Sequence, residues 1–228
     1  MRVPDSIDLV IFDCDGVLVD SEAISARVLI AALAELGVVV DLAHFSSHFV
    51  GRSFPTVAKT IREAFSVTLP DDFEAQYRAR LLDVFGEELT TTQGIRDILD
   101  AVKRPICVAT SSSPPRVKWS LALTGLTDYF GSAVFTASEV ENGKPAPDLF
   151  LHTAQQMGVD PARCLVIEDS LPGVHAGLAA GMPVMRYIGG THLRGRKPTD
   201  LKTPPNVTVF DKWQQFFHIM PELRKNED

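Results

Sequence analysis

The sequence has little of what marks several large classes of protein. Its three cysteines, Cys14, Cys107 and Cys164, are an odd number without paired C-x-x-C spacing. This pattern argues against a disulfide framework or a thiolate metal cluster and favours buried free thiols. The longest uninterrupted apolar run, residues 28–34, is far shorter than the roughly 20 residues of a membrane-spanning helix. We therefore expect no membrane-embedded segment.

Positive charge is also scarce. The 228 residues include 22 Lys and Arg against 29 Asp and Glu, a net charge of −7, and the one local basic cluster is residues 192–197. This balance argues against general affinity for nucleic acid or anionic membrane surfaces. Residues 1–6 contain an acidic residue before any long apolar stretch, unlike a secretory leader. We expect a cytoplasmic protein that is a monomer or a weak dimer.

Short apolar runs rich in β-branched residues recur along the chain and alternate with stretches of helical periodicity. Continuous apolar runs suit strands covered on both faces, and strands that alternate with helices indicate a parallel sheet. The sequence therefore predicts an α/β fold with a doubly wound, Rossmann-like parallel sheet. Such sheets bind ligands beyond the carboxyl ends of their strands. The runs are residues 7–12, 105–109, 133–136, 164–167, 182–188 and 207–210.

One long interval after the first run lacks a convincing strand. Helical patterns cover residues 26–36, 57–65 and 73–85. About seventy helical residues inserted between two strands indicate a separate small domain. The sequence thus predicts an α/β core domain made of residues 1–18 and 90–228 and a helical cap domain made of residues 19–89.

Acidic residues follow two of the predicted strands. Asp13 and Asp15 end the first run, where alternation along an extended chain places both on one side. Glu168 and Asp169 follow the fourth run. If both strands lie beside the switch point of the sheet, four carboxylates share one crevice, which a bound divalent cation makes tolerable. Because oxygen ligands suit Mg²⁺, the sequence predicts a magnesium site.

Hydroxyl groups and a lysine are expected beside these acids. Ser111 and Ser112 follow the second run, and their hydroxyls can contact phosphate oxygens together with nearby backbone N–H groups. Lys144 adds a positive charge on a segment stiffened by Pro145 and Pro147. Acids, hydroxyls and an ammonium group at one sheet edge predict a site for a phosphate group.

These four motifs, in this order, resemble those of the haloacid dehalogenase superfamily, whose members mostly hydrolyse phosphate monoesters. The helical interval resembles the cap of its β-phosphoglucomutase-like and sugar-phosphatase branch. The resemblance implies that Asp13 is the nucleophile that forms an aspartyl-phosphate, and that Asp15 is the general acid and then the general base. An acid that donates first must begin neutral, and we expect the crowded anionic site to raise the pKa of Asp15.

The resemblance also assigns the remaining groups. Mg²⁺ would be held by Asp13, the carbonyl of Asp15 and Asp169, with Glu168 as a direct or water-bridged ligand. The transferring phosphoryl group would be held by Ser111 and Lys144, with Ser112 as a further phosphate-binding hydroxyl. Dehalogenases and phosphonate-cleaving relatives lack the second acid of the first motif, so Asp15 favours phosphoryl transfer.

The predicted function is Mg²⁺-dependent hydrolysis of a small phosphorylated metabolite, most of all a sugar phosphate. A phosphosugar mutase is the alternative, but the mutase's histidine that activates the sugar hydroxyl aligns with Ser25, and its phosphate-binding arginine aligns with Phe54. A non-enzymatic receiver phosphorylated on Asp13 is a third hypothesis, against which Asp15 and the cap argue. The candidates for contact with the polar end of the substrate are Arg52, Arg78 and Arg80.

Overall fold

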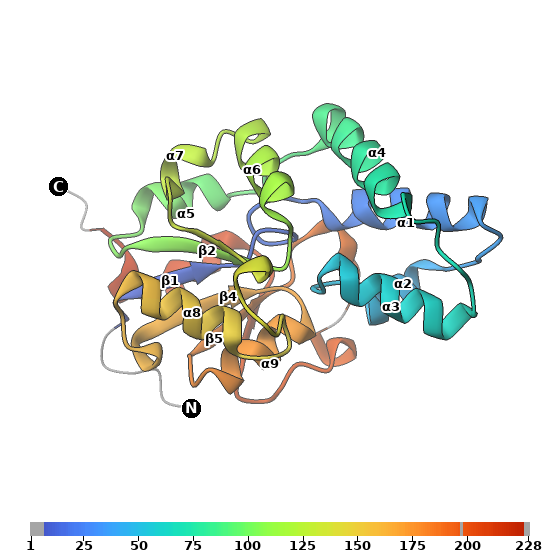
Figure 1. Cartoon of the computed structure of the whole chain (residues 1–228). Coiled ribbons are helices and arrows are strands. Elements are labelled where there is room, and N and C mark those ends of the chain that lie inside the picture. Colours follow the sequence, from blue (N-terminus) through green and yellow to red (C-terminus); the bar gives the residue numbers. More distant parts are fainter. Residues whose placement is uncertain (1–6, 197, 226–228) are drawn as a thin grey trace.

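Six parallel strands form the sheet of the computed structural model, which describes residues 7–196 and 198–225 (Figure 1). The N-terminal segment, for which no secretory leader was expected, lies outside the described residues. The strand order is β3-β2-β1-β4-β5-β6, so the chain reverses direction across the sheet between β1 and β4. The strands are β1 Leu9–Phe12, β2 Ile106–Thr110, β3 Val134–Thr136, β4 Cys164–Glu168, β5 Val184–Tyr187 and β6 Thr208–Phe210.

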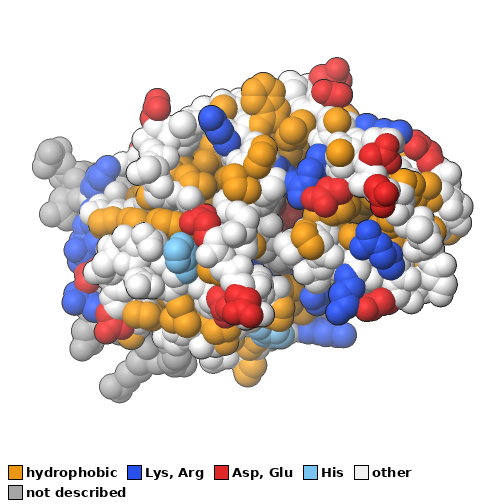
Figure 2. Space-filling view, viewed as in Figure 1, with side chains coloured by type: hydrophobic (Ala, Val, Ile, Leu, Met, Phe, Trp, Pro, Cys, Tyr) orange, Lys and Arg blue, Asp and Glu red, His pale blue; other side chains and the backbone are white. Residues whose placement is uncertain are grey.

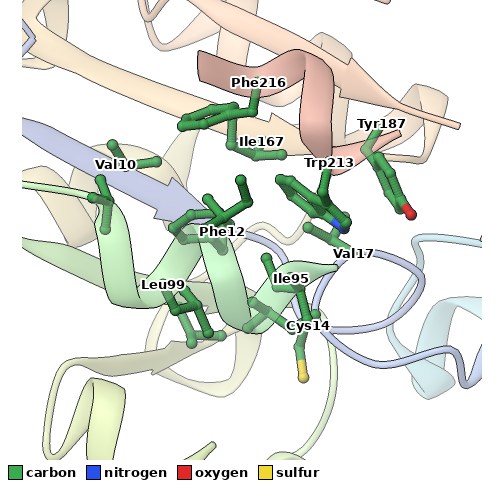
Figure 3. Packing of buried hydrophobic residues seen from close by; sticks show 14 of the residues in the cluster. Val10, Phe12, Cys14, Val17, Ile95, Leu99, Ile167, Tyr187, Trp213 and Phe216 are labelled. Atoms are coloured by element: carbon green, nitrogen blue, oxygen red, sulfur yellow. The ribbon is translucent and has the colours of Figure 1, made fainter. Parts of the chain in front are cut away.

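The strands are continuous apolar runs because both faces of the sheet are covered. In β1, Val10 and Phe12 belong to one hydrophobic cluster, whereas Leu9 and Ile11 belong to another. Figure 3 shows the first cluster, in which Phe12 lies close to Trp213. The predicted doubly wound α/β fold is confirmed, and the strand ends differ from the prediction by at most two residues.

Helices cover the two faces of the sheet. On the face of Val10 and Phe12 lie α5 Ile95–Ala101, α6 Pro114–Leu123, α7 Thr127–Phe130 and α10 Phe216–Ile219. On the face of Leu9 and Ile11 lie α8 Asp148–Met157 and α9 Leu171–Ala179. Short 3-10 turns connect these elements: η1 Ala137–Glu139, η2 Pro161–Arg163, η3 Thr191–Leu193, η4 Pro198–Leu201, η5 Trp213–Gln215 and η6 Pro221–Leu223. None of the helices in the described part is both long and apolar enough to cross a membrane.

Four helices between β1 and β2 lie together beyond one end of the sheet (Figure 1). They are α1 Glu22–Glu35, α2 Leu42–His48, α3 Phe54–Phe65 and α4 Phe73–Glu88. Leu33, Ile61 and Leu81 belong to a hydrophobic cluster of their own, separate from those of the sheet. The predicted helical insertion is therefore present, and we keep the name cap for it. The domain boundaries at residues 18/19 and 89/90 stay a prediction.

The surface carries charges of both signs. Figure 2 shows one face, on which the acidic and basic side chains of the described residues are interspersed. Some charged side chains are paired across elements, as in Arg27 with Glu88 and Arg80 with Glu35, each at 2.6 Å. Exposed pairs of this kind stabilise the fold only weakly.

Candidate active site

The carboxyl ends of β1 and β4 lie side by side where the strand order reverses. Phe12 pairs with Ile167, so the residues that follow these two strands meet. One ligand oxygen from each of Asp13, Glu168 and Asp169 lies within 4.8 Å of the others, and all three residues are buried. The structure thus brings together acids that are about 155 positions apart in the sequence. This is the arrangement expected for the carboxyl ends of two neighbouring parallel strands at the switch point of a sheet.

This group of carboxylates fits a divalent cation. Burial raises the pKa of Asp13 well above its usual value, an effect that Lys144 opposes and Glu168 and Asp169 reinforce. Burial also raises the pKa of Asp169, again with a contribution from Glu168. The Oδ2 atom of Asp169 is buried without a hydrogen bond from a described residue. A cation with oxygen ligands, such as Mg²⁺, would offset this concentration of negative charge.

The residue after Asp15 must be small for this site to exist. Gly16 has a φ of +78°, which favours glycine, and a Cβ atom at this position would overlap the carboxylate of Asp169. The glycine therefore permits both the sharp turn after β1 and the close approach of the two acidic segments.

Lys144 connects the two acidic strands. Its Nζ atom donates to Asp13 Oδ1 at 2.8 Å, to Glu168 Oε1 at 2.6 Å and to the carbonyl of Ala109 at 3.0 Å, so all three ammonium protons are used. Burial alone would lower the pKa of Lys144, but Asp13 and Glu168 raise it above its usual value. A permanently charged ammonium group beside Asp13 can attract phosphate oxygens.

Glu168 holds Lys144 in this position. Its Oε2 atom accepts hydrogen bonds from the backbone N–H groups of Asp169 and Ser170, both at 3.0 Å, and from Ser170 Oγ at 2.9 Å. Gly173 leaves space for this carboxylate, because a Cβ atom there would overlap it. The engagement of both oxygens by protein donors fits an indirect role at a metal site better than direct ligation. Metal ligation by Glu168 stays a prediction.

Asp15 faces the cap side of the same crevice. Its Oδ1 atom accepts from Ser21 Oγ at 2.5 Å and from Arg116 Nη2 at 2.6 Å, and its Oδ2 atom accepts from Ser112 Oγ. Burial alone would raise the pKa of Asp15, but Arg116 and the two hydroxyls lower it. The expected raised pKa of Asp15 is therefore wrong, because the prediction counted neighbouring acids and overlooked a buried cation.

Arg116 is the largest omission of the sequence analysis. It lies in the first turn of α6, donates to Asp15 and to Ser25 Oγ at 3.0 Å, and lies over the ring of Phe85, 5.3 Å from its centroid. It therefore contacts the core and two helices of the cap. A signal existed, since a cation in the first turn of a helix opposes the helix dipole and needs a compensating anion.

The hydroxyl groups of the two serines that follow β2 donate hydrogen bonds to different partners. Ser112 Oγ donates to Asp15, whereas Ser111 Oγ donates to the carbonyl of Gly51 in the cap at 3.1 Å. Thr110 is buried, lines the cavity between the core and the cap, and accepts from the backbone N–H of Ser112 at 3.1 Å. Thr110 is the last residue of β2, one residue beyond the predicted apolar run, because a β-branched threonine readily continues a strand.

The three arginine candidates of the cap differ in position. Arg52 and Arg78 line the cavity, together with apolar side chains of all four cap helices. Arg78 donates to Glu74 Oε1 through Nε and Nη2, and to Ser113 Oγ through Nη1. Arg80 lies outside this cavity and pairs with Glu35 on the exposed surface. The prediction for Arg80 is corrected accordingly, because residues two apart on a helix are about 200° apart around its axis.

Glu22 is a second acid that the sequence analysis did not select. It is buried, lies in the first turn of α1 and lines the cavity. Burial raises the pKa of Glu22 to about 8, with a further contribution from Asp15 that His192 opposes. At neutral pH this residue is mostly a neutral acid, able to donate a hydrogen bond into the cavity.

Comparison with known proteins shows what this arrangement is similar to. The model of the family described as haloacid dehalogenase-like hydrolase matches residues 7–181. Over 220 residues, 96% of this chain and 95% of the relative, the chain is 31% identical to the 6-phosphogluconate phosphatase of Escherichia coli K12. It is 35% identical to the fructose-1-phosphate phosphatase of the same organism over 179 residues, 75% of this chain and 92% of that protein.

One solved structure shares the fold over nearly the whole chain. The β-phosphoglucomutase of Clostridium difficile has a TM-score of 0.80 to this structure, with 95% of this chain and 96% of that chain covered. The two sequences are 23% identical, so the likeness concerns the fold alone.

Proposed function

The chain belongs to the haloacid dehalogenase-like hydrolases and is a phosphoric monoester hydrolase, and from this premise we propose that it hydrolyses a small sugar phosphate with Mg²⁺. The observation that carries the proposal is the convergence of Asp13, Lys144 and Asp169 at the switch point of the sheet. Its position under a helical cap, at the edge of a cavity lined by residues of the core and the cap, favours a small substrate.

Asp13 is the group best placed to attack phosphorus. Its Oδ1 atom accepts from Lys144, and no described residue donates a hydrogen bond to Oδ2. In the proposed first step Oδ2 forms a bond to phosphorus while the bond from phosphorus to the leaving oxygen breaks. The resulting aspartyl-phosphate is then hydrolysed, so that one difficult displacement becomes two easier ones.

Lys144 is placed to stabilise the phosphoryl oxygens, and a bound metal would share this role. Lys144 is held by two carboxylates and a carbonyl, so its charge is fixed in place before substrate binds, which is what makes such groups effective. Bound Mg²⁺ would supply further positive charge beside the phosphate. We assign Asp13, the carbonyl of Asp15 and Asp169 to hold it.

Asp15 carries the proton in both steps. As an ionised carboxylate it can accept a proton from the water that attacks the aspartyl-phosphate. To protonate the leaving alkoxide it must first be neutral, and a dianionic phosphate bound beside it would raise its pKa. We therefore propose that substrate binding loosens the contact between Asp15 and Arg116, which lowers the pKa of Asp15 in the free protein.

The cap side of the cavity supports a polar substrate. Arg52 lines the cavity without an ion pair to a described residue, and Arg78 is held there by Glu74 and Ser113. The two relatives named for phosphorylated sugars or sugar acids are consistent with this polarity. We propose that these two arginines contact the end of the substrate away from the phosphate.

The test is the variant Asp13→Asn, assayed for phosphate release from p-nitrophenyl phosphate in the presence of Mg²⁺. We expect a loss of at least about a thousandfold in kcat, because removal of a nucleophile typically has an effect of this size. Asp97→Asn, on the exposed surface of α5, is the matched control and should leave activity unchanged. Phosphate release that survives the Asp13 substitution would refute the proposal.

The mutase alternative has its own assay. Ser25, which occupies the position of the mutase's histidine, donates to the carbonyl of Ser21 and accepts from Arg116, so it belongs to the network around Asp15. Incubation with a hexose 1-phosphate and a bisphosphate activator should release phosphate without accumulation of the 6-phosphate. Accumulation of the 6-phosphate would favour the mutase.

A further inference from the structure

A histidine from the loop between β5 and β6 reaches the acidic cluster. His192 lies in η3, and its Nε2 atom is 2.9 Å from Asp169 Oδ2. The side chains are almost fully enclosed, with exposed fractions of 6% for His192 and 2% for Asp169. The contact joins two segments that follow different strands of the sheet, and no step of the proposed reaction uses it.

The imidazole occupies a slot between two glycines. A Cβ atom at Gly16 would lie 2.9 Å from His192 Cε1, and a Cβ atom at Gly190 would lie 2.9 Å from both Cε1 and Nδ1. Both ring nitrogens of His192 are buried without a hydrogen bond to a described residue, and the Asp169 carboxylate, 2.9 Å from Nε2, is the acid that pairs with the ring. A buried polar ring that fills a slot and contacts a single carboxylate can fix the orientation of that carboxylate.

The loop that carries His192 is fixed on both sides. Thr191 donates to Asp20 Oδ1 through its backbone N–H at 3.0 Å and through its hydroxyl at 2.8 Å. Leu193 packs with Ile188 and Leu201 in a small hydrophobic cluster. The backbone of Asp169 is also held, since Arg186 Nε donates to its carbonyl at 2.8 Å. The ring and the carboxylate therefore face each other from two anchored segments.

We propose that His192 is a positioning residue of the metal site, which holds the Asp169 carboxylate in the orientation that binds Mg²⁺. This inference rests on the proposed function, since it presumes that Asp169 is a metal ligand. Partners that orient a ligating group raise metal affinity, and their loss typically weakens binding or activity by about 10- to 100-fold. The proposal also gives residues 190–193, in the loop between β5 and β6, a part in the site.

The experiment measures Mg²⁺ binding to the full chain by calorimetry, without substrate. His192→Ala and His192→Phe both remove the N–H donor, and His192→Phe keeps the slot filled. His192→Gln retains an N–H group at a similar reach. We expect the Kd for Mg²⁺ to rise about tenfold or more in the first two variants and to stay within a few-fold of wild type in His192→Gln. His175→Ala, on the exposed side of α9, is the control and should bind as wild type does.

The metal-free melting temperature of each variant separates positioning from simple packing. If His192→Phe melts as wild type does and binds Mg²⁺ weakly, the positioning role is supported. If His192→Phe binds Mg²⁺ as tightly as wild type, the inference is overturned while the proposed function stands. If the wild-type protein binds no Mg²⁺ at all, the metal part of the proposed function fails, and the inference fails with it.

Discussion

Arg78 and Arg80 are two residues apart on α4 and have different surroundings. Arg78 lines the cavity, whereas Arg80 pairs with Glu35 on the surface. With a sugar phosphate as substrate, Arg78→Ala should raise KM about tenfold, because a hydrogen bond to a charged group contributes about 1.5–3 kcal/mol. Arg80→Ala should change KM less than about twofold, since exposed pairs contribute little.

The substrate without a polar end provides the control for this comparison. Phenyl phosphate has no polar group at the end away from the phosphate for Arg78 to contact, so its KM should be nearly the same in Arg78→Ala and in the wild type. Equal effects of Arg78→Ala on both substrates would contradict a role for Arg78 in substrate recognition.

The buried carboxyl group of Glu22 should make the stability of the protein depend on pH. Burial raises its pKa in the folded chain from 4.5 to about 8, so the folded state binds this proton more tightly than the unfolded state does. Its contribution to stability is therefore complete below pH 4.5 and is lost as the pH rises through about 8. In the metal-free protein, the free energy of unfolding of Glu22→Gln should increase relative to that of wild type by at most about 1.4 kcal/mol for each pH unit in this window.

The measurement is urea unfolding of wild type and Glu22→Gln in EDTA at pH 5, 6.5 and 8. We expect the two proteins to be closest in stability at pH 5 and furthest apart at pH 8. A difference that does not change with pH would show that Glu22 does not carry the raised pKa.

Among single residues, the sequence revealed the groups with strong local signals. Asp13, Asp15, Lys144 and Asp169 each follow or precede a recognisable strand or proline segment, and the structure brings these four residues to one sheet edge. The pairing of Arg116 with Asp15 could not be found in this way, because the two residues are 101 positions apart and only the fold brings them together.

Gly51, at the turn between α2 and α3, lies at a close contact between the cap and the core. Its carbonyl accepts from Ser111, and a Cβ atom there would overlap the side chain of Ser170 at the start of α9. Gly51→Ala should therefore push the cap away from the strand ends and lower kcat/KM about tenfold or more, because cap closure excludes water from the reaction.

Gly37→Ala is the matched control for the backbone. Gly37 and Gly51 both have a φ of +75°, but a Cβ atom at Gly37 meets no other atom within 4 Å. Both variants should lose about 1–2 kcal/mol of stability to the left-handed backbone conformation. Only Gly51→Ala should lose activity in a steady-state assay, and an equal loss in both variants would contradict the proposed contact.

At the scale of elements, the sequence was most informative for long helices and for strands that are buried on both faces. The strands were predictable because burial on both faces leaves continuous apolar runs, and α1, α3 and α4 because their apolar residues recur at helical spacing. The helix α2 was not assigned, since its seven residues bury only Phe45 and depend on Asp41, which accepts from the backbone N–H of His44. Such a short helix shows no full period.

At the scale of the whole molecule, the candidate active site lies between the core and the cap of one chain. The core supplies Asp13, Asp15, Lys144 and Arg116, while the cap supplies Arg52, Arg78 and Glu22. Since one chain provides every group assigned to the reaction, we propose that it acts as a monomer or a weak dimer without a nucleic-acid partner. Its cytoplasmic location remains a prediction.

The most direct test of the central claim is mass spectrometry of the enzyme quenched in acid during turnover of p-nitrophenyl phosphate with Mg²⁺. The variant Asp15→Asn is used because p-nitrophenolate leaves without a proton, whereas hydrolysis of the aspartyl-phosphate needs the base. We predict that a phosphoryl group accumulates on the peptide that contains Asp13, at the carboxylate of that residue. Turnover by the wild type with a phosphoryl group on another residue, or on none in either protein, would contradict the account.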